Sequence, residues 1–437
     1  MPVDTRVDTR VGTRVDTRSG ARGGTRGGTR GGGALCAVLL AAAVLTGCGG
    51  GSGGGNGGGA QRPVTVAGKQ RQSAPLPIPR GTGSKLPTDF NGDGAPDLVL
   101  DALAHDGLGD DPGIGVVYGK KGHGPVPDTR QLLSPATYKA STLSSEASCD
   151  LDRDGFADLV VSTDPPYDGR GMPPVPLRVL FGSPRGISGE GVTLKIPARA
   201  RFGNEWPDRP VCGDFDGDGR EDLVVHASGG RLSVLPGPFT RAGAPRGTAR
   251  LAEVGGDVPT GPAADVNGDG ADDLLIRAHT GTARSTVALG GRNGFTAGAS
   301  YPAGTDAAFG RFGAAVLGAG GVTVYGSGGE GEGDGAVRVA GGGDRVHTGD
   351  FDGDGKVELA VSSGDADGSG RVRIVESSGA GKARSAPAAG RVVAVADFDG
   401  DGGDDLVVQR VSGNGDVVTV LTRARPRPTF STRAFTP

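Results

Sequence analysis

Six acidic strings of nearly identical sequence hold the residues of this chain most able to do chemistry. Each has side-chain oxygens at positions 1, 3, 5 and 9, an apolar residue at position 2, Gly at position 6 and Leu at position 10. Carboxylates this close together repel one another unless a cation lies between them. The strings are DFNGDGAPDLVL from Asp89, DLDRDGFADLVV from Asp150, DFDGDGREDLVV from Asp214, DVNGDGADDLLI from Asp265, DFDGDGKVELAV from Asp350 and DFDGDGGDDLVV from Asp397.

Oxygens at alternate positions of a tight loop converge on one point, where they can coordinate a hard cation. Gly at position 6 permits the sharp turn, and the backbone carbonyl of position 7 can complete the shell. Mg²⁺ is less suitable because it prefers octahedral geometry and retains its waters, so we predict up to six Ca²⁺ ions. The predicted ligands are Asp89, Asn91, Asp93, Ala95 and Asp97; Asp150, Asp152, Asp154, Phe156 and Asp158; Asp214, Asp216, Asp218, Arg220 and Asp222; Asp265, Asn267, Asp269, Ala271 and Asp273; Asp350, Asp352, Asp354, Lys356 and Glu358; and Asp397, Asp399, Asp401, Gly403 and Asp405.

These loops differ from an EF-hand at position 12. An EF-hand needs a bidentate Glu there, whereas this chain has an apolar residue, so each loop ends by entering a strand. The alternative interpretation is six solvated Asp/Gly turns without metal. Six copies in one register, each with apolar residues at positions 10 to 12, favour metal binding. The position-12 residues are Leu100, Val161, Val225, Ile276, Val361 and Val408.

A second string, rich in β-branched residues, follows each loop and predicts another strand. The loops begin 61, 64, 51, 85 and 47 residues apart, and the longest interval contains GVTVYG within 309–329, which matches the second string. We interpret this stretch as a unit without its acidic loop. Residues 85–437 then contain seven units of about 50 residues, the size of a four-stranded propeller blade. The second strings lie at 115–119, 177–182, 232–237, 285–291, 372–377 and 417–422.

The DxDxDGxxDL strings resemble the FG-GAP (VCBS-type) repeats of the integrin α-subunit N-terminal region. This resemblance implies an all-β fold, a seven-bladed β-propeller with four-stranded blades and Ca²⁺ in the loop joining the first two strands of a blade. Departures are the missing loop in blade 5, around 306–329, Asn91 and Asn267 at position 3, and Glu358 at position 9. FG pairs are few, which weakens any expectation of integrin-like partners.

The first 47 residues differ from the rest. Seven Arg precede the apolar run Ala34–Leu45, which is too short to span a bilayer, so residues 1–47 are typical of a signal peptide. The following LTGC resembles a bacterial lipobox, which implies lipidation of Cys48 and anchoring to the outer face of the bacterial cell membrane. We predict a disordered Gly/Pro-rich tether over 48–84. The alternative is an ordinary signal peptide in which Cys48 is incidental.

The net charge and the cysteine content give further expectations about partners and about disulfide bonding. Without residues 1–47, the remaining 39 basic and 47 acidic residues give a net charge of −8, so nucleic acid is a poor partner. The membrane contact expected is the lipid anchor alone. Cys149 and Cys212 lie one and two residues before corresponding loops, so they could be bridged on neighbouring strands. The one-residue offset points side chains to opposite strand faces, and the sequence leaves the bridge open.

Long connections at 101–113, 162–176 and 201–210 should project from the face opposite the acidic loops, on adjacent blades. Aromatic, Asp and Arg side chains on long loops suit a protein or carbohydrate ligand. The alternative is that Trp206 packs under its own loop. The candidate ligand-binding residues are His105, Asp106, Asp110, Asp111, Tyr167, Arg170, Trp206 and Arg209.

Motifs for catalysis are weak in this sequence. The five His residues show no metal-ligand spacing, and the paired acids are used as predicted metal ligands. We therefore expect an exported, lipid-anchored, calcium-binding module for binding or adhesion to a protein or glycan at the cell envelope. The alternatives are a propeller enzyme, such as a polysaccharide lyase or hydrolase, and a purely structural surface scaffold.

Overall fold

The computed structural model divides the chain into two units, Met1–Gly68 and Lys69–Pro437. All residues that the structure describes lie in the second unit. Among them, no helix has the length and apolarity that crossing a membrane requires. The described residues are 74–101, 103, 111–165, 175–201, 209–227, 231–247, 250–252, 258–278, 283–326, 336–364, 370–377, 383–412, 415–423, 425–427 and 429–435.

The described residues form seven antiparallel sheets, and each sheet is one blade. Blades 1 to 3 contain β1 (Leu98–Leu100), β2 (Ile114–Lys120) and β3 (Gly124–Leu133); β4 (Thr142–Cys149), β5 (Asp158–Asp164), β6 (Leu177–Leu180) and β7 (Val192–Thr193); and β8 (Val211–Gly213), β9 (Asp222–Ala227), β10 (Arg231–Leu235) and β11 (Arg250–Ala252).

Blades 4 and 5 contain β12 (Val258–Ala264), β13 (Asp273–Arg277), β14 (Arg284–Leu289) and β15 (Thr296–Pro302), followed by β16 (Asp306–Gly310), β17 (Gly313–Gly318), β18 (Gly321–Gly326) and β19 (Val337–Ala340). Blades 6 and 7 contain β20 (Arg345–Gly349), β21 (Glu358–Ser363), β22 (Arg371–Glu376) and β23 (Arg384–Ala389), followed by β24 (Arg391–Ala396), β25 (Asp405–Arg410), β26 (Val417–Thr422), β27 (Arg425–Pro426) and β28 (Phe430–Ser431). The helical turns are η1 (Pro135–Tyr138), α1 (Ala198–Arg201) and η2 (Thr432–Phe435).

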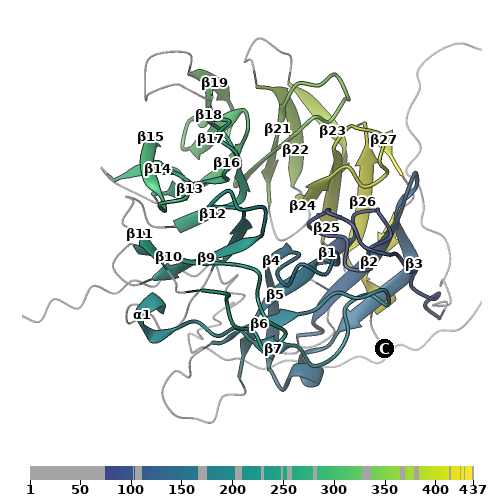
Figure 1. Cartoon of the computed structure of the whole chain (residues 1–437). Coiled ribbons are helices and arrows are strands. Elements are labelled where there is room, and N and C mark those ends of the chain that lie inside the picture. Colours follow the sequence, from purple (N-terminus) through teal and green to yellow (C-terminus); the bar gives the residue numbers. More distant parts are fainter. Residues whose placement is uncertain are drawn as a thin grey trace, which may run out of the picture. The chain divides into compact units, whose positions relative to one another are not determined.

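The blades follow one another around a central axis in sequence order (Figure 1). The first strands of blades 2 to 7 contact their neighbours in turn, and β24 of blade 7 contacts β1 of blade 1. Contacts between β2 and β4 complete the ring. The predicted all-β, seven-bladed propeller is therefore confirmed.

The three apolar residues at positions 10 to 12 of each acidic string pack on both faces of their strand. Leu223 and Val225, at positions 10 and 12 of blade 3, share a buried cluster with Val160 of blade 2. Val224, at position 11, points to the other face and packs with Leu274 of blade 4. The second strand of each blade is thus covered on both faces by neighbouring blades, which explains why its sequence is continuously apolar instead of alternating.

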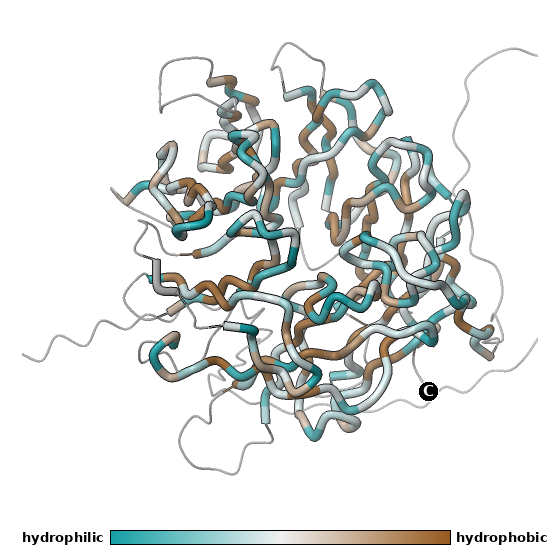
Figure 2. The backbone as a smooth tube through the Cα atoms, viewed as in Figure 1, coloured by the Kyte–Doolittle hydropathy of each residue, from teal (hydrophilic) through white to brown (hydrophobic). Residues whose placement is uncertain are grey.

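The same alternating contacts with the two neighbouring blades continue around the ring, and the contact between blades 7 and 1 closes it. Val407 of blade 7, at position 11, packs with Leu98 and Leu100 of blade 1. Figure 2 shows the strands largely in hydrophobic brown, with teal concentrated in the connections. The core is therefore a set of interfaces between blades, each supplied by two adjacent repeats.

Blade 5 has four strands although its acidic loop is missing. β16 ends at Gly310 and β17 begins at Gly313, so a two-residue turn replaces the loop. The predicted GVTVYG strand is β18. Ala315 and Leu317 still pack with Leu359 of blade 6. This blade keeps the alternating apolar contacts of the others and can form without a metal site.

The boundary of the tether differs from the predicted end at residue 84. Within the described residues, the Gly81 and Gly83 amides donate to the carbonyls of Asn91 and Gly92, both at 3.0 Å. A Cβ on Gly81 would lie 1.7 Å from the Gly92 oxygen. Gly81 and Gly83 allow the segment 74–84 to lie against the first acidic loop. Residues 74–84 therefore belong to the folded part, while 48–73 and the predicted signal peptide lie outside the described residues.

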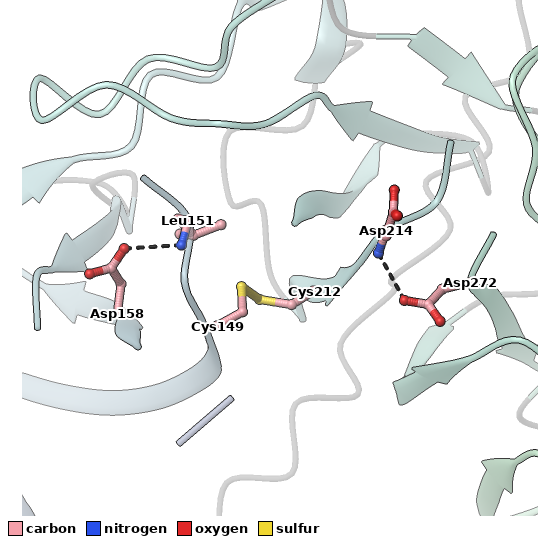
Figure 3. The surroundings of a disulfide bond; sticks show 6 residues. All are labelled: Cys149, Leu151, Asp158, Cys212, Asp214 and Asp272. Carbon is pink, nitrogen blue, oxygen red and sulfur yellow. Dashed lines mark hydrogen bonds between the residues drawn. A yellow bond between two sulfur atoms is a disulfide. The ribbon is translucent and has the colours of Figure 1, made fainter. Parts of the chain in front are cut away.

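Cys149, the last residue of β4, and Cys212, in β8, form a disulfide with Cα atoms 6.3 Å apart (Figure 3). The sequence offset, which seemed unfavourable, has a simple geometric role. Neighbouring blades meet through opposite faces of equivalent strands, so residues offset by one point toward each other across the interface. The bridge joins blades 2 and 3 covalently.

Loss of this bridge should destabilise the propeller. We expect Cys149→Ser with Cys212→Ser to lower the free energy of unfolding by about 2–4 kcal/mol, because the unfolded chain regains freedom over a separation of 63 residues. Chemical denaturation of both forms, with and without reductant, measures the effect. Reduction should bring the wild type to the variant's stability and leave the variant unchanged. An intact mass that does not gain two hydrogens on reduction would show that no bridge forms.

Candidate metal centres

The Asp at position 1 organises each acidic loop. In blade 6, Asp350 Oδ1 accepts the amides of Gly353 at 2.7 Å and Asp354 at 3.1 Å, and Oδ2 accepts the amide of Gly355 at 2.9 Å. In all six loops, the position-1 carboxylate accepts from the amides of positions 5 and 6. The six loops therefore share one turn conformation.

Two positions of this turn require left-handed backbone. Gly353 and Gly355, at positions 4 and 6, have φ angles of 79° and 81°. Sequence reasoning explained position 6 alone. Position 4 is Gly in five loops, and in the loop of blade 2 it is Arg153, with φ of 62°. That loop carries a backbone conformation that side chains other than Gly rarely adopt.

The acid at position 9 fastens each loop to its blade. Asp97 accepts the Phe90 amide at 2.9 Å with one oxygen and the Gly119 amide, near the end of β2, at 2.8 Å with the other. The matching residues Asp158 and Asp273 accept amides in the same two ways. Position 9 was predicted as a ligand only, and the structure gives it this additional role.

Four loops bring three or four carboxylates together, with one oxygen from each within 4.8 Å of the others. The fourth carboxylates of three of these loops, Asp154, Asp222 and Asp401, lie outside the groups. The groups are Asp350, Asp352, Asp354 and Glu358; Asp150, Asp152 and Asp158; Asp214, Asp216 and Asp218; and Asp397, Asp399 and Asp405.

The two loops with Asn at position 3 are arranged differently. Asn267 Nδ2 donates to Asp269 Oδ2 at 3.0 Å, while its Oδ1 accepts the Asp269 amide at 2.9 Å. Asn91 and Asp93 repeat both contacts, at 3.3 and 3.2 Å. An amide donor thus lies beside a carboxylate that would otherwise face another carboxylate, which reduces the charge repulsion in these loops.

The predicted position-7 ligands are held through their amides in five loops. Ala95, Phe156, Ala271, Lys356 and Gly403 each donate their N–H to the position-5 carboxylate at 2.9–3.1 Å. This contact fixes the amide of the residue whose carbonyl we predicted as a ligand.

Basic side chains contact carboxylates at positions 3 and 5. Arg241, from the connection between β10 and β11, pairs with Asp152 and Asp154 of the preceding blade and lies 4.4 Å above the Phe181 ring. Sequence reasoning missed this residue because it lies 87 positions from Asp154 and no local motif connects the two. The other pairs within 3 Å are Arg220 and Arg246 with Asp218, Lys356 with Asp354, Arg423 with Asp401, and Arg427 with Asp399.

Burial raises the pKa of the position-9 acids. The pKa of Asp158 is raised to about 8, by burial first and then by the nearby Asp152 carboxylate. Burial likewise raises the pKa of Asp222, Glu358 and Asp405 to about 7. Without a cation these groups hold protons near neutral pH, and a bound cation would favour their ionised form.

The donors present fit a hard divalent cation. Asp152 Oδ1 and Asp222 Oδ2 are buried and accept no hydrogen bond. Buried carboxylate oxygens without a partner are costly unless an ion or proton compensates them. Each loop offers oxygen donors, with no Cys or His among the predicted ligands, which suits Ca²⁺ or Mg²⁺ better than a transition metal.

Residues 350–408 match the family model described as FG-GAP-like repeat. The chain contains an FG-GAP-like repeat. The matched segment begins with the acidic loop of blade 6 and ends within β25 of blade 7. The other acidic loops share the hydrogen-bond pattern of the two loops within this segment.

A search of the curated proteins found no match. Solved structures similar to this chain include the crystal structure of BBS1N in complex with ARL6DN, soaked with lead. That match has 13% identity and a TM-score of 0.44, and covers 78% of this chain and 94% of that chain. A structure from a mechanistic analysis of two prolyl endopeptidases has 14% identity and a TM-score of 0.41, and covers 82% of this chain and 48% of that one. Likenesses this weak carry no argument about function.

Two of the eight candidate ligand-binding residues are described. Asp111 accepts the Gly113 amide at 2.8 Å and the Leu143 amide of β4 at 2.7 Å, so its carboxylate ties blade 1 to blade 2. Arg209, with φ of 51°, lies just before β8. The remaining candidates lie outside the described residues: His105, Asp106, Asp110, Tyr167, Arg170 and Trp206.

In chelator, the protein should lose stability as the pH rises toward 8. The folded-state pKa values of Asp158, Asp222 and Asp405 are about 8, about 7 and about 7, against an ordinary pKa of 3.8. The folded chain therefore binds more protons than the unfolded chain in this window, and the free energy of unfolding falls as pH increases. The buried His347, whose pKa is lowered to about 4, opposes this trend only below its ordinary value of 6.5.

Thermal unfolding between about pH 6.5 and about pH 8 measures the trend, and saturating Ca²⁺ should abolish it because the ion favours the ionised carboxylates. A melting temperature that rises with pH in chelator would contradict the assignment of these acids.

Proposed function

We propose that this protein is a calcium-stabilised β-propeller that serves as an exported, lipid-anchored binding or adhesion module. The observation that carries the calcium part is the recurrence of one loop conformation in six blades, with unpartnered carboxylate oxygens buried in three of the loops. A resident cation would supply positive charge where the carboxylates converge.

The residues at positions 1, 3, 5 and 9, with the position-7 carbonyl, would hold each ion. Three or four carboxylates per loop exceed the one or two that Mg²⁺ commonly uses, because Mg²⁺ retains several waters. Ca²⁺ accepts six to eight oxygens in flexible geometry. The loops of blades 2, 6 and 7 are the best candidates, since their carboxylate groups include the buried acid at position 9.

Sequence features support the export and anchoring parts of the proposal. The apolar run Ala34–Leu45 and the LTGC ending at Cys48 are typical of a bacterial lipoprotein signal. Millimolar Ca²⁺ outside the cell would fill sites with dissociation constants of roughly 10⁻⁴ to 10⁻³ M. A protein or glycan is the proposed partner, bound at the long connections opposite the acidic loops.

Binding is proposed in preference to catalysis because position-9 acids with raised pKa are used structurally. Both oxygens of Asp158 and of Asp273 accept backbone amides within their own blades. A general acid or base must instead be within reach of a substrate.

Calcium should raise the melting temperature strongly. At about 10 mM Ca²⁺, each filled site adds about 1–3 kcal/mol to the free energy of unfolding if its dissociation constant is 10⁻⁴ to 10⁻³ M. Several sites together should shift the melting temperature by on the order of 10 °C. The measurement is thermal unfolding of the protein in excess EGTA, in Ca²⁺ and in Mg²⁺. An equal response to Mg²⁺, or none to Ca²⁺, would count against calcium loops.

Substitution of Cys48 tests the anchoring part separately. In a bacterial host grown with a labelled fatty acid, the wild type should carry the label and fractionate with membranes. The Cys48→Ser variant should lose both properties, and Cys36→Ser should retain them as the matched control. Equal labelling of wild type and Cys48→Ser would exclude lipidation at this residue.

A further inference from the structure

One acidic residue outside the predicted ligand set joins the loops of blades 3 and 4. Asp272 Oδ2 accepts the amide of Asp214 at 2.8 Å, and the Asp272 amide donates to the Asp214 carbonyl at 2.9 Å (Figure 3). Asp214 is the first predicted ligand of the blade 3 loop, and Asp272 precedes Asp273, the last predicted ligand of the blade 4 loop. A single residue therefore holds both backbone groups of a ligand in the neighbouring site.

The same arrangement occurs independently between blades 6 and 7. Asp404 Oδ2 accepts the Asp350 amide at 2.9 Å, and the Asp404 amide donates to the Asp350 carbonyl at 2.7 Å. Asp404 also occupies position 8 and precedes the predicted ligand Asp405. Two copies with matching distances argue against an accidental contact.

Other neighbouring loops offer internal comparisons. Between blades 1 and 2, position 8 is Ala157, whose amide donates to the Asp89 carbonyl at 3.0 Å. Alanine has no carboxylate that could accept the Asp89 amide. This amide donates to the Leu86 carbonyl instead, at 3.2 Å. Blade 5 has a short turn in place of an acidic loop, which interrupts the series after blade 4. The double link thus defines two pairs of loops, those of blades 3 and 4 and those of blades 6 and 7.

We propose that Asp272 and Asp404 are positioning residues that couple metal binding within these two pairs. The inference rests on the proposed calcium sites. An ion held by Asp273 restrains the adjoining peptide of Asp272, which in turn fixes the backbone of Asp214. The Asp214 carboxylate accepts the amides of Asp218 and Gly219, so ordering its backbone orders the whole blade 3 turn. The second ion then meets a loop whose conformational entropy is already reduced, and its binding is favoured.

The coupling can be measured loop by loop with hydrogen–deuterium exchange during a Ca²⁺ titration of the whole protein. Peptides within 211–227 report the blade 3 loop, and peptides within 345–364 report the blade 6 loop. We expect Asp272→Ala to raise the Ca²⁺ midpoint of the blade 3 loop by roughly fivefold and to leave the blade 6 loop unchanged. Asp404→Ala should produce the reverse pattern and is the matched control.

The variant Asp272→Asn separates the hydrogen bond from the charge. Its side-chain oxygen can still accept the Asp214 amide, so the blade 3 midpoint should remain near that of the wild type. A midpoint raised equally by Asn and Ala would mean that the charge of Asp272 acts by attracting the cation, and would overturn a positioning role.

Disabling the blade 4 loop tests the coupling directly. Asp269 is an exposed position-5 ligand, so Asp269→Ala should remove that site while preserving the blade. We expect this change to raise the blade 3 midpoint in the wild-type background and to have no further effect in Asp272→Ala. An equal effect in both backgrounds, or none in either, would overturn the coupling. If no loop of the wild type gains protection with Ca²⁺, the proposed calcium function itself fails.

Discussion

The fold depends on how the buried acid at position 9 is accommodated. In blades 1, 2 and 4 its two oxygens accept amides, one from its own loop and one from the end of the next strand in the sheet, as Asp97 does with Phe90 and Gly119. These bonds fix the acidic loop at the start of a strand whose two faces are covered by neighbouring blades. Burial at the same time makes the negative charge costly, as the raised pKa of Asp158 shows. One group thus shapes the loop and, when it is ionised, favours a positive charge nearby.

The sequence predicted much of this architecture, because the repeats are regular and each position of the motif has one physical task. The apolar residues at positions 10 to 12, the Gly at position 6 and the interval of 85 residues were sufficient to predict seven blades and the blade without a loop. Relations between repeats were not accessible in the same way. Arg241 and Asp272 act on loops 87 and 58 positions away, and a single sequence carries no sign of which distant residue will meet a loop. The Cys149–Cys212 pair shows the same limit, since its offset becomes meaningful only when adjacent blades face each other.

Basic residues on the acidic loops give the repeats different electrostatic characters. Four loops with carboxylates at positions 1, 3, 5 and 9 have Arg or Lys partners, whereas the loops containing Asn91 and Asn267 use an amide donor in the same place. Each arrangement offsets the repulsion of clustered carboxylates when no ion is bound. A cation that binds a loop with an Arg or Lys partner must compete with the guanidinium or ammonium group for the carboxylates. The six loops are therefore similar in shape but differ in the charged group with which an ion competes.

The contact of residues 74–84 with the first loop has a mechanical consequence. Gly81 and Gly83 bind Asn91 and Gly92, and the Ser84 amide donates to Gly155 in the second loop at 2.8 Å. Tension applied to the chain on the N-terminal side of residue 74 would first load the hydrogen bond from the Leu76 amide to the Asp128 carbonyl of β3, at 2.6 Å, and would then reach these two loops. The resistance of the propeller to pulling from that end would therefore be set by one hydrogen bond to β3 and by the rigidity of two acidic turns.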